Sequence, residues 1–318
     1  MERVLVTGGA GFIGSHLCER LCREGVSVTA LDSFDPFYDP AIKRANLSGL
    51  AAGDGFRLVE GDIRDDETVE KVFVQGQFDT VAHLAARAGV RPSREESRVY
   101  HDVNVTGTAV LLEAARRHGV KKFLFGSSSS VYGNNEKVPF AEDDPVERPV
   151  SPYAASKRAG ELTAYTYHHL YGLDMLCLRF FTVYGPRQRP EMAIHKFTRL
   201  ITEGRPVPRF GSGETMRDYT YIDDIIDGVM GAARQGRGYR IYNLGESMTT
   251  TLSRLIELIE AAAGKRAVVE EHPPQPGDVD HTFADISRAR AEIGYAPSIT
   301  LEEGIPRFVE WYRSERQR

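Results

Sequence analysis

The feature that most constrains the fold is a glycine-rich segment near the start of the chain. It follows the apolar stretch Val4-Leu5-Val6 and precedes a helical pattern over residues 15–24. Within it, Gly9, Gly11 and Gly14 match the spacing G-x-G-x-x-G. This spacing allows a tight turn, close approach of the backbone to a pyrophosphate, and close packing of the helix on the strand. It therefore predicts a strand, a loop and a helix whose N-terminus faces the phosphates of a dinucleotide.

An acidic residue ends the next predicted strand, which covers residues 26–31. This residue, Asp32, follows the glycine segment at the distance of about 20 residues that is typical of dinucleotide-binding units. A carboxylate there fits the diol of an adenosine ribose and repels a 2′-phosphate. The sequence therefore favours NAD as the cofactor, while the nearby cations Lys43 and Arg44 leave NADP as an alternative.

Buried strands and helices alternate along the first 180 residues, which predicts a parallel sheet. In such sheets ligands bind beyond the carboxyl ends of the strands. Asp62 and Ile63 follow one predicted strand, and residues 84–86 end another. We expect these residues to border the adenine and the ribose of the cofactor, with Asn104 nearby inside a helix predicted over residues 99–118.

Two further patterns indicate chemistry at this edge. Four serines, residues 127–130, follow the strand at 122–125. Ser151 and Pro152 form a helix start, which places Tyr153 and Lys157 one turn apart on one helix face. An adjacent ammonium stabilises a phenolate, so we expect the pKa of Tyr153 to fall below its ordinary value of about 10. The pattern predicts a tyrosine base, although by itself it also fits an exposed helix face.

Composition limits the possible partners. The net charge of −5 argues against a nucleic-acid or anionic-membrane surface. No apolar run approaches the roughly 20 residues of a spanning helix, so we expect a cytoplasmic protein without a membrane partner. The three cysteines suggest no disulfide framework, and neither they nor the nine histidines show the spacing of metal ligands. No metal is predicted.

Taken together, these motifs resemble the extended short-chain dehydrogenase/reductase family, specifically its nucleotide-sugar epimerases; the serines are followed by the matching Val131-Tyr132-Gly133. The resemblance implies an α/β fold, a Rossmann-type doubly wound parallel sheet with a smaller α+β substrate-binding domain. We expect the NAD-binding domain at residues 1–180 and the UDP-sugar-binding domain at 181–318, with a strand near 239–244 that could rejoin the first. Relatives usually form homodimers.

The resemblance also implies roles for individual residues. Tyr153 would be the catalytic base, Lys157 would lower its pKa and hold the nicotinamide ribose, and Ser128 would share the proton, with Ser129 and Ser130 as alternatives. The expected cofactor-binding residues are Gly8, Gly11, Phe12, Ile13, Gly14, Asp32, Asp62, Ile63, Leu84, Ala85, Ala86, Asn104, Tyr153 and Lys157. The expected substrate-binding residues are Arg91, Ser128, Ser129, Ser130, Thr182, Arg189, Arg217 and Asp278.

The implied reaction is inversion at C4 of a UDP-sugar through a transient 4-keto intermediate. Thr182 stands where galactose-type epimerases usually have Asn, and this departure is similar to the UDP-glucuronate 4-epimerases, as are Phe37-Tyr38-Asp39 and Ala88-Gly89-Val90-Arg91. Because a guanidinium pairs bidentately with a carboxylate, we expect Arg189, with Thr182, to receive the C6 carboxylate of UDP-glucuronate. Arg91 is an alternative. Arg217 would contact the diphosphate and Asp278 the uridine ribose.

Other activities fit the chain less well. A UDP-glucose or UDP-N-acetylglucosamine 4-epimerase would differ only in its sugar pockets, and Gln275 as well as Thr182 argues against it. A dehydratase needs a carboxylate beside the strand-end hydroxyl, and a UDP-glucuronate decarboxylase commonly has Glu where Ser130 stands. A non-catalytic NAD-sensing regulator would not need the intact Ser128, Tyr153 and Lys157.

Overall fold

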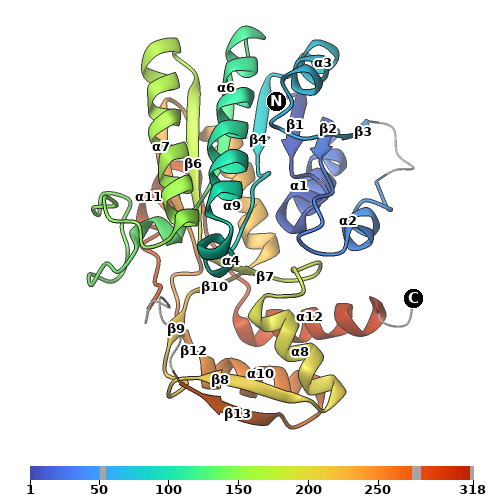
Figure 1. The fold of residues 1–318 in the computed structure, drawn as a ribbon, viewed down its shortest axis with the longest axis vertical. Helices are drawn as coiled ribbons and strands as arrows, with labels where there is room; N and C mark the ends of the chain where they lie inside the picture. Colours follow the sequence, from blue (N-terminus) through green and yellow to red (C-terminus); the bar gives the residue numbers. More distant parts are fainter. Residues whose placement is uncertain (51–54, 274–280, 316–318) are drawn as a thin grey trace.

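Seven parallel strands form the central sheet of the protein, in the order β11-β6-β5-β4-β1-β2-β3 (Figure 1). The computed structural model describes residues 1–50, 55–273 and 281–315. The strands of this sheet are β1 (Arg3–Thr7), β2 (Ser27–Asp32), β3 (Phe56–Glu60), β4 (Thr80–His83), β5 (Lys122–Ser128), β6 (Asp174–Phe180) and β11 (Tyr239–Leu244). The predicted Rossmann-type sheet is confirmed, and β11 joins its edge by pairing with β6.

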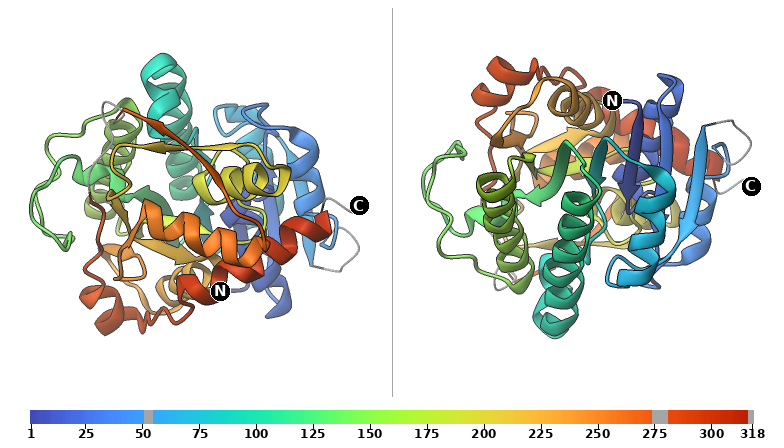
Figure 2. Two further views of the ribbon diagram at one scale, coloured as in Figure 1. Left: turned by 90° about the horizontal axis from the view of Figure 1, so that it is seen from below. Right: turned by 90° about the horizontal axis from the view of Figure 1, so that it is seen from above.

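Helices cover both faces of the sheet (Figures 1 and 2). One face carries α1 (Phe12–Arg23), α9 (Ile222–Gln235) and α11 (Ser287–Ile293), and the other carries α3 (Asp66–Gly76), α6 (Gly107–Arg117) and α7 (Pro152–Tyr171). Successive side chains of a strand point to opposite faces. Accordingly Val4 and Val6 belong to the core beneath α1, and Leu5 belongs to the opposite core. Burial on both faces explains why the strands read as continuous apolar runs.

The remaining elements lie mostly below the carboxyl edge of the sheet in Figure 1. The helices there are α8 (Ala193–Glu203), α10 (Leu252–Ala263) and α12 (Leu301–Glu315). Three short strand pairs accompany them: β7 (Thr182–Tyr184) with β10 (Tyr219–Tyr221), β9 (Met216–Arg217) with β12 (Thr250–Thr251), and β8 (Pro206–Phe210) with β13 (Val268–His272). Both α8 and α12 pack on α10, and their buried side chains are continuous with the core beneath α1.

Two helices differ from the sequence-based expectation. The first, α1, begins at Phe12 rather than at residue 15. Its N-cap residue is Gly11, whose backbone is still extended. The helix expected over residues 99–118 consists of α5 (Ser97–His101), a π-helical turn (Asp102–Thr106) and α6. Asn104 lies in the π turn, and such turns occur frequently at functional sites.

Shorter elements connect the main ones at the carboxyl edge of the sheet. They are α2 (Pro40–Asn46), α4 (Val90–Glu95) and a 3₁₀ turn (Ser129–Tyr132). Among the helices of the described residues, none is long and apolar enough to cross a membrane.

Candidate active site

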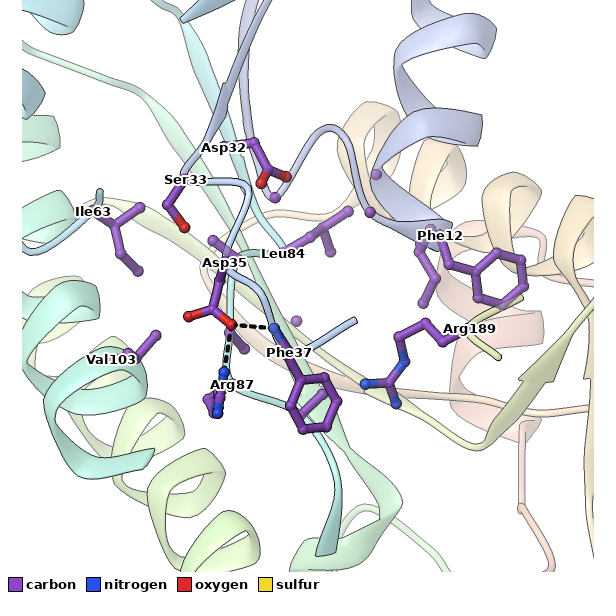
Figure 3. Close-up of a pocket in the computed structure, with 18 of the residues that line it drawn as sticks. Phe12, Asp32, Ser33, Asp35, Phe37, Ile63, Leu84, Arg87, Val103 and Arg189 are labelled. Carbon is purple, nitrogen blue, oxygen red and sulfur yellow. Dashed lines mark hydrogen bonds and ion pairs between the residues drawn. The ribbon is translucent and has the colours of Figure 1, made fainter. Parts of the chain in front are cut away.

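A pocket at the carboxyl edge of the sheet collects most of the predicted site residues (Figure 3). Its walls come from the glycine segment after β1, the loop after β2, the ends of β4 and β5, the start of α7 and the segment around β7. The predicted residues that line it are Gly8, Gly11, Phe12, Ile13, Gly14, Asp32, Asp62, Ile63, Leu84, Ala85, Ala86, Ser128, Tyr153, Lys157 and Arg189. Residues far apart in the sequence therefore share one cavity.

The glycine segment is packed too tightly for side chains at two positions. Gly8 has a φ of +70°, and a Cβ there would lie 2.7 Å from the backbone nitrogen of Ala85. A Cβ at Gly14 would lie 2.1 Å from the carbonyl oxygen of Gly8. Glycine thus lets the start of α1 pack closely on the strand ends, and Gly8, Gly11 and Gly14 line the pocket where a dinucleotide pyrophosphate would approach.

Asp32 lies at the end of β2 and is almost completely buried. Its two carboxylate oxygens accept hydrogen bonds from the backbone N–H groups of Ala10 (3.0 Å) and Phe34 (2.9 Å). A carboxylate has about four acceptor positions. The geometry therefore leaves acceptor capacity for the hydroxyl groups of a ribose, and the pocket fits the adenosine half of NAD.

Tyr153 is placed by the start of α7. Ser151 caps this helix by accepting a hydrogen bond from the backbone N–H of Ala154 at 3.1 Å. The phenol hydrogen-bonds with the hydroxyl of Ser128, and the Ser130 hydroxyl donates to the Ser128 Oγ at 2.9 Å. Ser128 is thus the serine that meets Tyr153, while Ser130 supports Ser128.

The pKa of Tyr153 is shifted upward, opposite to the direction expected from the Tyr–Lys spacing. Burial raises the pKa, and the hydrogen bond with Ser128 and the positive charge of Arg189 oppose this effect only in part. The sequence pattern showed the neighbouring ammonium but not the loss of solvent around the phenol, which disfavours the charged form.

Lys157 is buried beneath Tyr153. Its Nζ donates a hydrogen bond of 2.6 Å to the carbonyl oxygen of Gly126 and lies 5.9 Å from the centroid of the Tyr153 ring. Burial lowers the pKa of Lys157 to about 8, and the carboxylate of Glu161 opposes this shift. The ammonium is consequently close to its point of deprotonation at mildly alkaline pH.

A buried ion pair supports the floor of the pocket. Arg179 on β6 donates to Glu161 on α7 through its Nε and Nη2 at 2.8 and 2.9 Å, and both side chains are fully buried. Ser127 donates to the same carboxylate at 2.7 Å. This network joins β5, β6 and α7 directly behind Ser128 and Lys157. Its members were not predicted as site residues.

The loop between β2 and α2 contributes lining residues that the sequence reading did not assign. Ser33, Asp35, Phe37 and Tyr38 line the pocket, as does Arg87 from the loop after β4. Figure 3 shows the Phe37 ring between the side chains of Arg87 and Arg189. The guanidinium carbons lie 4.7 and 5.7 Å from the ring centroid. The sequence signal for this loop was the resemblance at Asp32-Ser33-Phe34 with Phe37-Tyr38-Asp39.

Several predicted residues lie outside the pocket lining. Val183 lines the pocket, but the preceding strand residue Thr182 does not, since successive strand side chains point to opposite sides. Arg91 lies over the Phe210 ring, with 5.9 Å between the guanidinium carbon and the centroid. Arg217 belongs to β9. Asp278 falls outside the described residues.

Asn104 also stands behind the lining rather than in it. Its side chain donates to the backbone oxygen of Arg87 at 3.0 Å and to the Ser156 hydroxyl at 2.9 Å, and it accepts from the backbone N–H of Arg87 at 2.8 Å. Among the described residues, no group of three or more His, Cys, Asp or Glu is arranged to hold a metal ion.

Comparison with known proteins identifies the family. A family model described as GDP-mannose 4,6 dehydratase matches residues 5–308. The chain belongs to this family. It is a family of extended short-chain dehydrogenases/reductases, so the resemblance inferred from the motifs is confirmed.

Curated relatives of this family member include named epimerases. The chain is 44% identical to UDP-glucuronate 4-epimerase of Thermodesulfobacterium geofontis, over 98% of this chain and 96% of the relative. It is 43% identical to UDP-glucuronate 4-epimerase 5 of Arabidopsis thaliana, over 97% of this chain and 75% of the relative.

Solved structures of the family have the same fold. UDP-glucuronic acid 4-epimerase from Bacillus cereus, in complex with UDP-glucuronic acid and NAD, has a TM-score of 0.93 and 34% identity, with 99% of this chain and 100% of that chain covered. UDP-glucose 4-epimerase from Thermotoga maritima, with UDP-glucose, has a TM-score of 0.92 and 34% identity, with 98% of this chain and 99% of that chain covered. The fold by itself therefore does not separate acid from neutral sugar substrates.

Proposed function

We propose that this protein is an NAD-dependent epimerase that converts UDP-glucuronate to UDP-galacturonate by inverting C4. One observation carries the proposal: Ser128, Tyr153, Lys157 and Arg189 share the pocket formed by the glycine segment and Asp32. A base, a proton-sharing hydroxyl and a cation for a carboxylate thus surround a dinucleotide site. The curated relatives named UDP-glucuronate 4-epimerases support the choice of sugar.

The cofactor site would hold NAD across the sheet edge. The bare backbone around Gly8 and Gly14 would bind the diphosphate, Asp32 would bind the adenosine ribose, and Lys157 with Tyr153 would bind the nicotinamide ribose. When bound, NAD supplies the acceptor and then the donor of the C4 hydride, so that the reaction consumes no external reductant.

The protein would move one proton and orient the sugar. Tyr153 takes the proton of the 4-hydroxyl, and the Ser128 hydroxyl hydrogen-bonds to the same oxygen while Ser130 holds Ser128 in place. Lys157 and Arg189 favour the phenolate by their charge, and burial keeps water away from the reacting carbon. After the 4-keto sugar turns over, Tyr153 returns the proton to the inverted hydroxyl.

Arg189 would receive the C6 carboxylate. Its guanidinium is largely buried at the pocket wall and pairs with Glu191 at 3.0 Å, so it holds a fixed position when the substrate enters. Oxidation of glucuronate at C4 makes a β-keto acid, and Arg189 would keep the carboxylate out of alignment with the ketone. The roles of Arg217 at the diphosphate, Asp278 at the uridine ribose, and Thr182 or Arg91 at the sugar stay predictions.

The deciding experiment is an assay of products without added NAD. The purified protein is incubated separately with UDP-glucuronate and UDP-glucose, and the products are resolved by chromatography and mass. We expect UDP-galacturonate from the first sugar only. UDP-galactose from the second sugar only would make the protein a UDP-glucose 4-epimerase, and a UDP-pentose would make it a decarboxylase.

Replacement of Arg189 tests the sugar assignment. Arg189→Ala should lower kcat/KM for UDP-glucuronate by about 100-fold, because a bidentate charge-assisted pair contributes roughly 3 kcal/mol. The affinity for UDP-glucose, measured as a competitive inhibitor, should change little, and UDP-pentose should appear as a side product. An equal loss for both sugars would contradict the assignment, and Tyr153→Phe provides the inactive control with the cofactor still bound.

We also propose the assembly, the location and the division into domains. Leu162 and Tyr165 on α7 are 53% and 51% exposed, and this apolar helix face supports a homodimer, for which light scattering should give twice the 35.4 kDa chain mass.

The three free cysteines fit a cytoplasmic location, which cell fractionation would test. Residues 1–180 with β11 would bind NAD, and the rest of residues 181–318 would bind the UDP-sugar.

A further inference from the structure

The loop between β2 and α2 forms one wall of the pocket and is connected to the opposite wall. It begins directly after Asp32 and supplies Ser33, Asp35, Phe37 and Tyr38 to the lining. A cofactor whose ribose is bound at Asp32 lies against this loop, so movement of the loop is the obvious way for the cofactor to leave. The contacts that hold the loop in place would therefore determine how long the cofactor stays bound.

Arg87 is the main connection between the loop and the rest of the pocket. Its Nη1 forms an ion pair with Asp35 in the loop, and its Nη2 donates to Glu96, which follows α4, at 2.7 Å. The guanidinium carbon also lies 4.7 Å from the centroid of the Phe37 ring. One side chain, only 14% exposed, thus contacts two residues of the loop and one of the helical segment after β4.

The backbone of Arg87 is fixed independently. The side chain of Asn104 accepts from its N–H at 2.8 Å and donates to its carbonyl oxygen at 3.0 Å. Asn104 itself lies in the π-helical turn and bonds to Ser156 on α7. Arg87 therefore extends from a rigid base, and its ion pairs transmit that rigidity to the loop.

The loop has a conformation that needs such support. Phe34 has a φ of +50°, which is unfavourable for a residue with a side chain. Strained backbone persists only where the surroundings fix it. Within the loop, the Asp35 side chain also accepts from the Phe37 N–H at 2.9 Å, and Lys43 donates to the Asp35 carbonyl oxygen at 2.8 Å. Asp35 is thus the residue through which Arg87 can hold the whole loop.

We propose that Arg87, Asp35 and Glu96 form a clasp that keeps the β2–α2 loop closed over the cofactor and sets how slowly NAD leaves. Arg87 and Glu96 are positioning residues in this assignment, and Glu96 lies outside the pocket lining. The proposal rests on the proposed function, because an epimerase that regenerates NAD in every cycle has no need to exchange it. The clasp would slow the release of NAD from the site.

The test measures cofactor exchange instead of turnover. Holoenzyme purified with its bound NAD is mixed with excess isotope-labelled NAD, and the unlabelled NAD that remains bound is followed by filtration and mass spectrometry. The variants are Glu96→Gln, Arg87→Gln and Arg87→Lys. The matched control is Arg240→Gln, which removes another ion pair between two elements, with Glu292 at 3.1 Å, away from the pocket. Thermal unfolding with saturating NAD checks that each variant is folded.

Loss of one arm of the clasp should accelerate exchange by about twofold to fivefold, the effect of one partly exposed ion pair. We expect Glu96→Gln to show this change, Arg87→Gln to exceed it because both arms are lost, and Arg87→Lys to fall between wild type and Arg87→Gln. Arg240→Gln should exchange at the wild-type rate.

Three results would overturn the clasp. Equal exchange rates in wild type and in all variants would mean that the loop does not control release. Faster exchange in Arg87→Gln with an unchanged rate in Glu96→Gln would assign Arg87 a direct contact with the cofactor instead. A wild-type protein that binds no NAD even after incubation with it would overturn the proposed function as well, which distinguishes the two failures.

Discussion

Lys157 shows how burial tunes a single ionisable group in this site. Its ammonium donates to the Gly126 carbonyl oxygen and lies beneath the Tyr153 ring, where little solvent reaches it. Burial lowers the pKa of Lys157 to about 8. The charge that favours the phenolate of Tyr153 is therefore present at neutral pH and is lost as the pH rises through 8.

This shift predicts an alkaline limit of activity. Epimerase kcat/KM should fall above about pH 8, because deprotonation of Lys157 removes the charge that stabilises the phenolate. Lys157→Met should lose roughly 100-fold or more in kcat/KM, the usual contribution of a positioned acid–base system, and its residual activity should have no limb near pH 8. Steady-state rates between pH 5.5 and 10 measure both effects. A limb near pH 8 that persists in Lys157→Met would assign it to another group.

At the scale of elements, the loop between β7 and α8 is held rigidly where it presents Arg189. Gln188 is buried and donates to the Val183 carbonyl oxygen at 3.0 Å. Arg187, with a φ of +66°, donates to Glu19 on α1 at 2.6 Å. The loop that carries the proposed carboxylate contact is thus tied to the helix that begins at the glycine segment.

Breaking this tie should weaken the recognition of the acid sugar without touching the pocket. Glu19→Gln, which removes the charge that holds Arg187, should raise KM for UDP-glucuronate by about fivefold, which corresponds to an ion pair of roughly 1 kcal/mol, and should leave kcat nearly unchanged. Arg234→Gln is the control, because Arg234 pairs with Glu24, the C-cap residue at the other end of the same helix. A change in kcat with an unaltered KM would show that the loop positions something other than the substrate carboxylate.

At the scale of the whole molecule, acidic groups lie where the central sheet meets the part below it. The buried carboxylate of Asp218 accepts from the backbone N–H groups of Glu246 (2.7 Å), Ser247 (3.1 Å) and Ala284 (3.1 Å), which joins segments distant in the sequence. Burial raises the pKa of Asp218 to about 6. Burial, helped by the charges of Asp224 and Asp218, raises the pKa of Glu246 to about 8.

These shifts predict that stability falls as the pH rises toward 8. A carboxyl group with a raised pKa keeps a proton that the unfolded chain releases, so its contribution to stability is full below the unfolded pKa of about 4.3 and is lost by about pH 8. Lys157, whose folded pKa is about 8, contributes a slope of the opposite sign near pH 8, and the histidines of the unfolded chain titrate near pH 6.5, so the contribution of Glu246 is the difference between wild type and variant. Between pH 7 and 8, Glu246→Gln should remove the part of the slope that lowers stability as the pH rises, as measured by urea unfolding with saturating NAD. An unchanged slope would refute the assignment.

Local patterns were sufficient to predict the framework of the protein. Continuous apolar runs between helical patterns predicted the parallel sheet because both of its faces are buried. The glycine spacing, Asp32 and the Ser151-Pro152 helix start predicted their local structures because turn geometry and capping depend on neighbouring residues alone. The order of the strands then brings all their carboxyl ends to one edge, which placed Ser128, Tyr153 and Lys157 together correctly.

The tertiary structure decided what depends on neighbours distant in the sequence. The upward pKa shift of Tyr153 follows from burial by several elements, which no local spacing encodes. Arg87, Asp35 and Glu96 meet only after three segments have packed together, and the side chain of Thr182 falls on the other side of its strand from Val183. Sequence by itself determined the family of folds and the main chemical groups of this protein. Solvent exclusion and long-range contacts, which exist only in the folded chain, determined how those groups are charged, held and closed in.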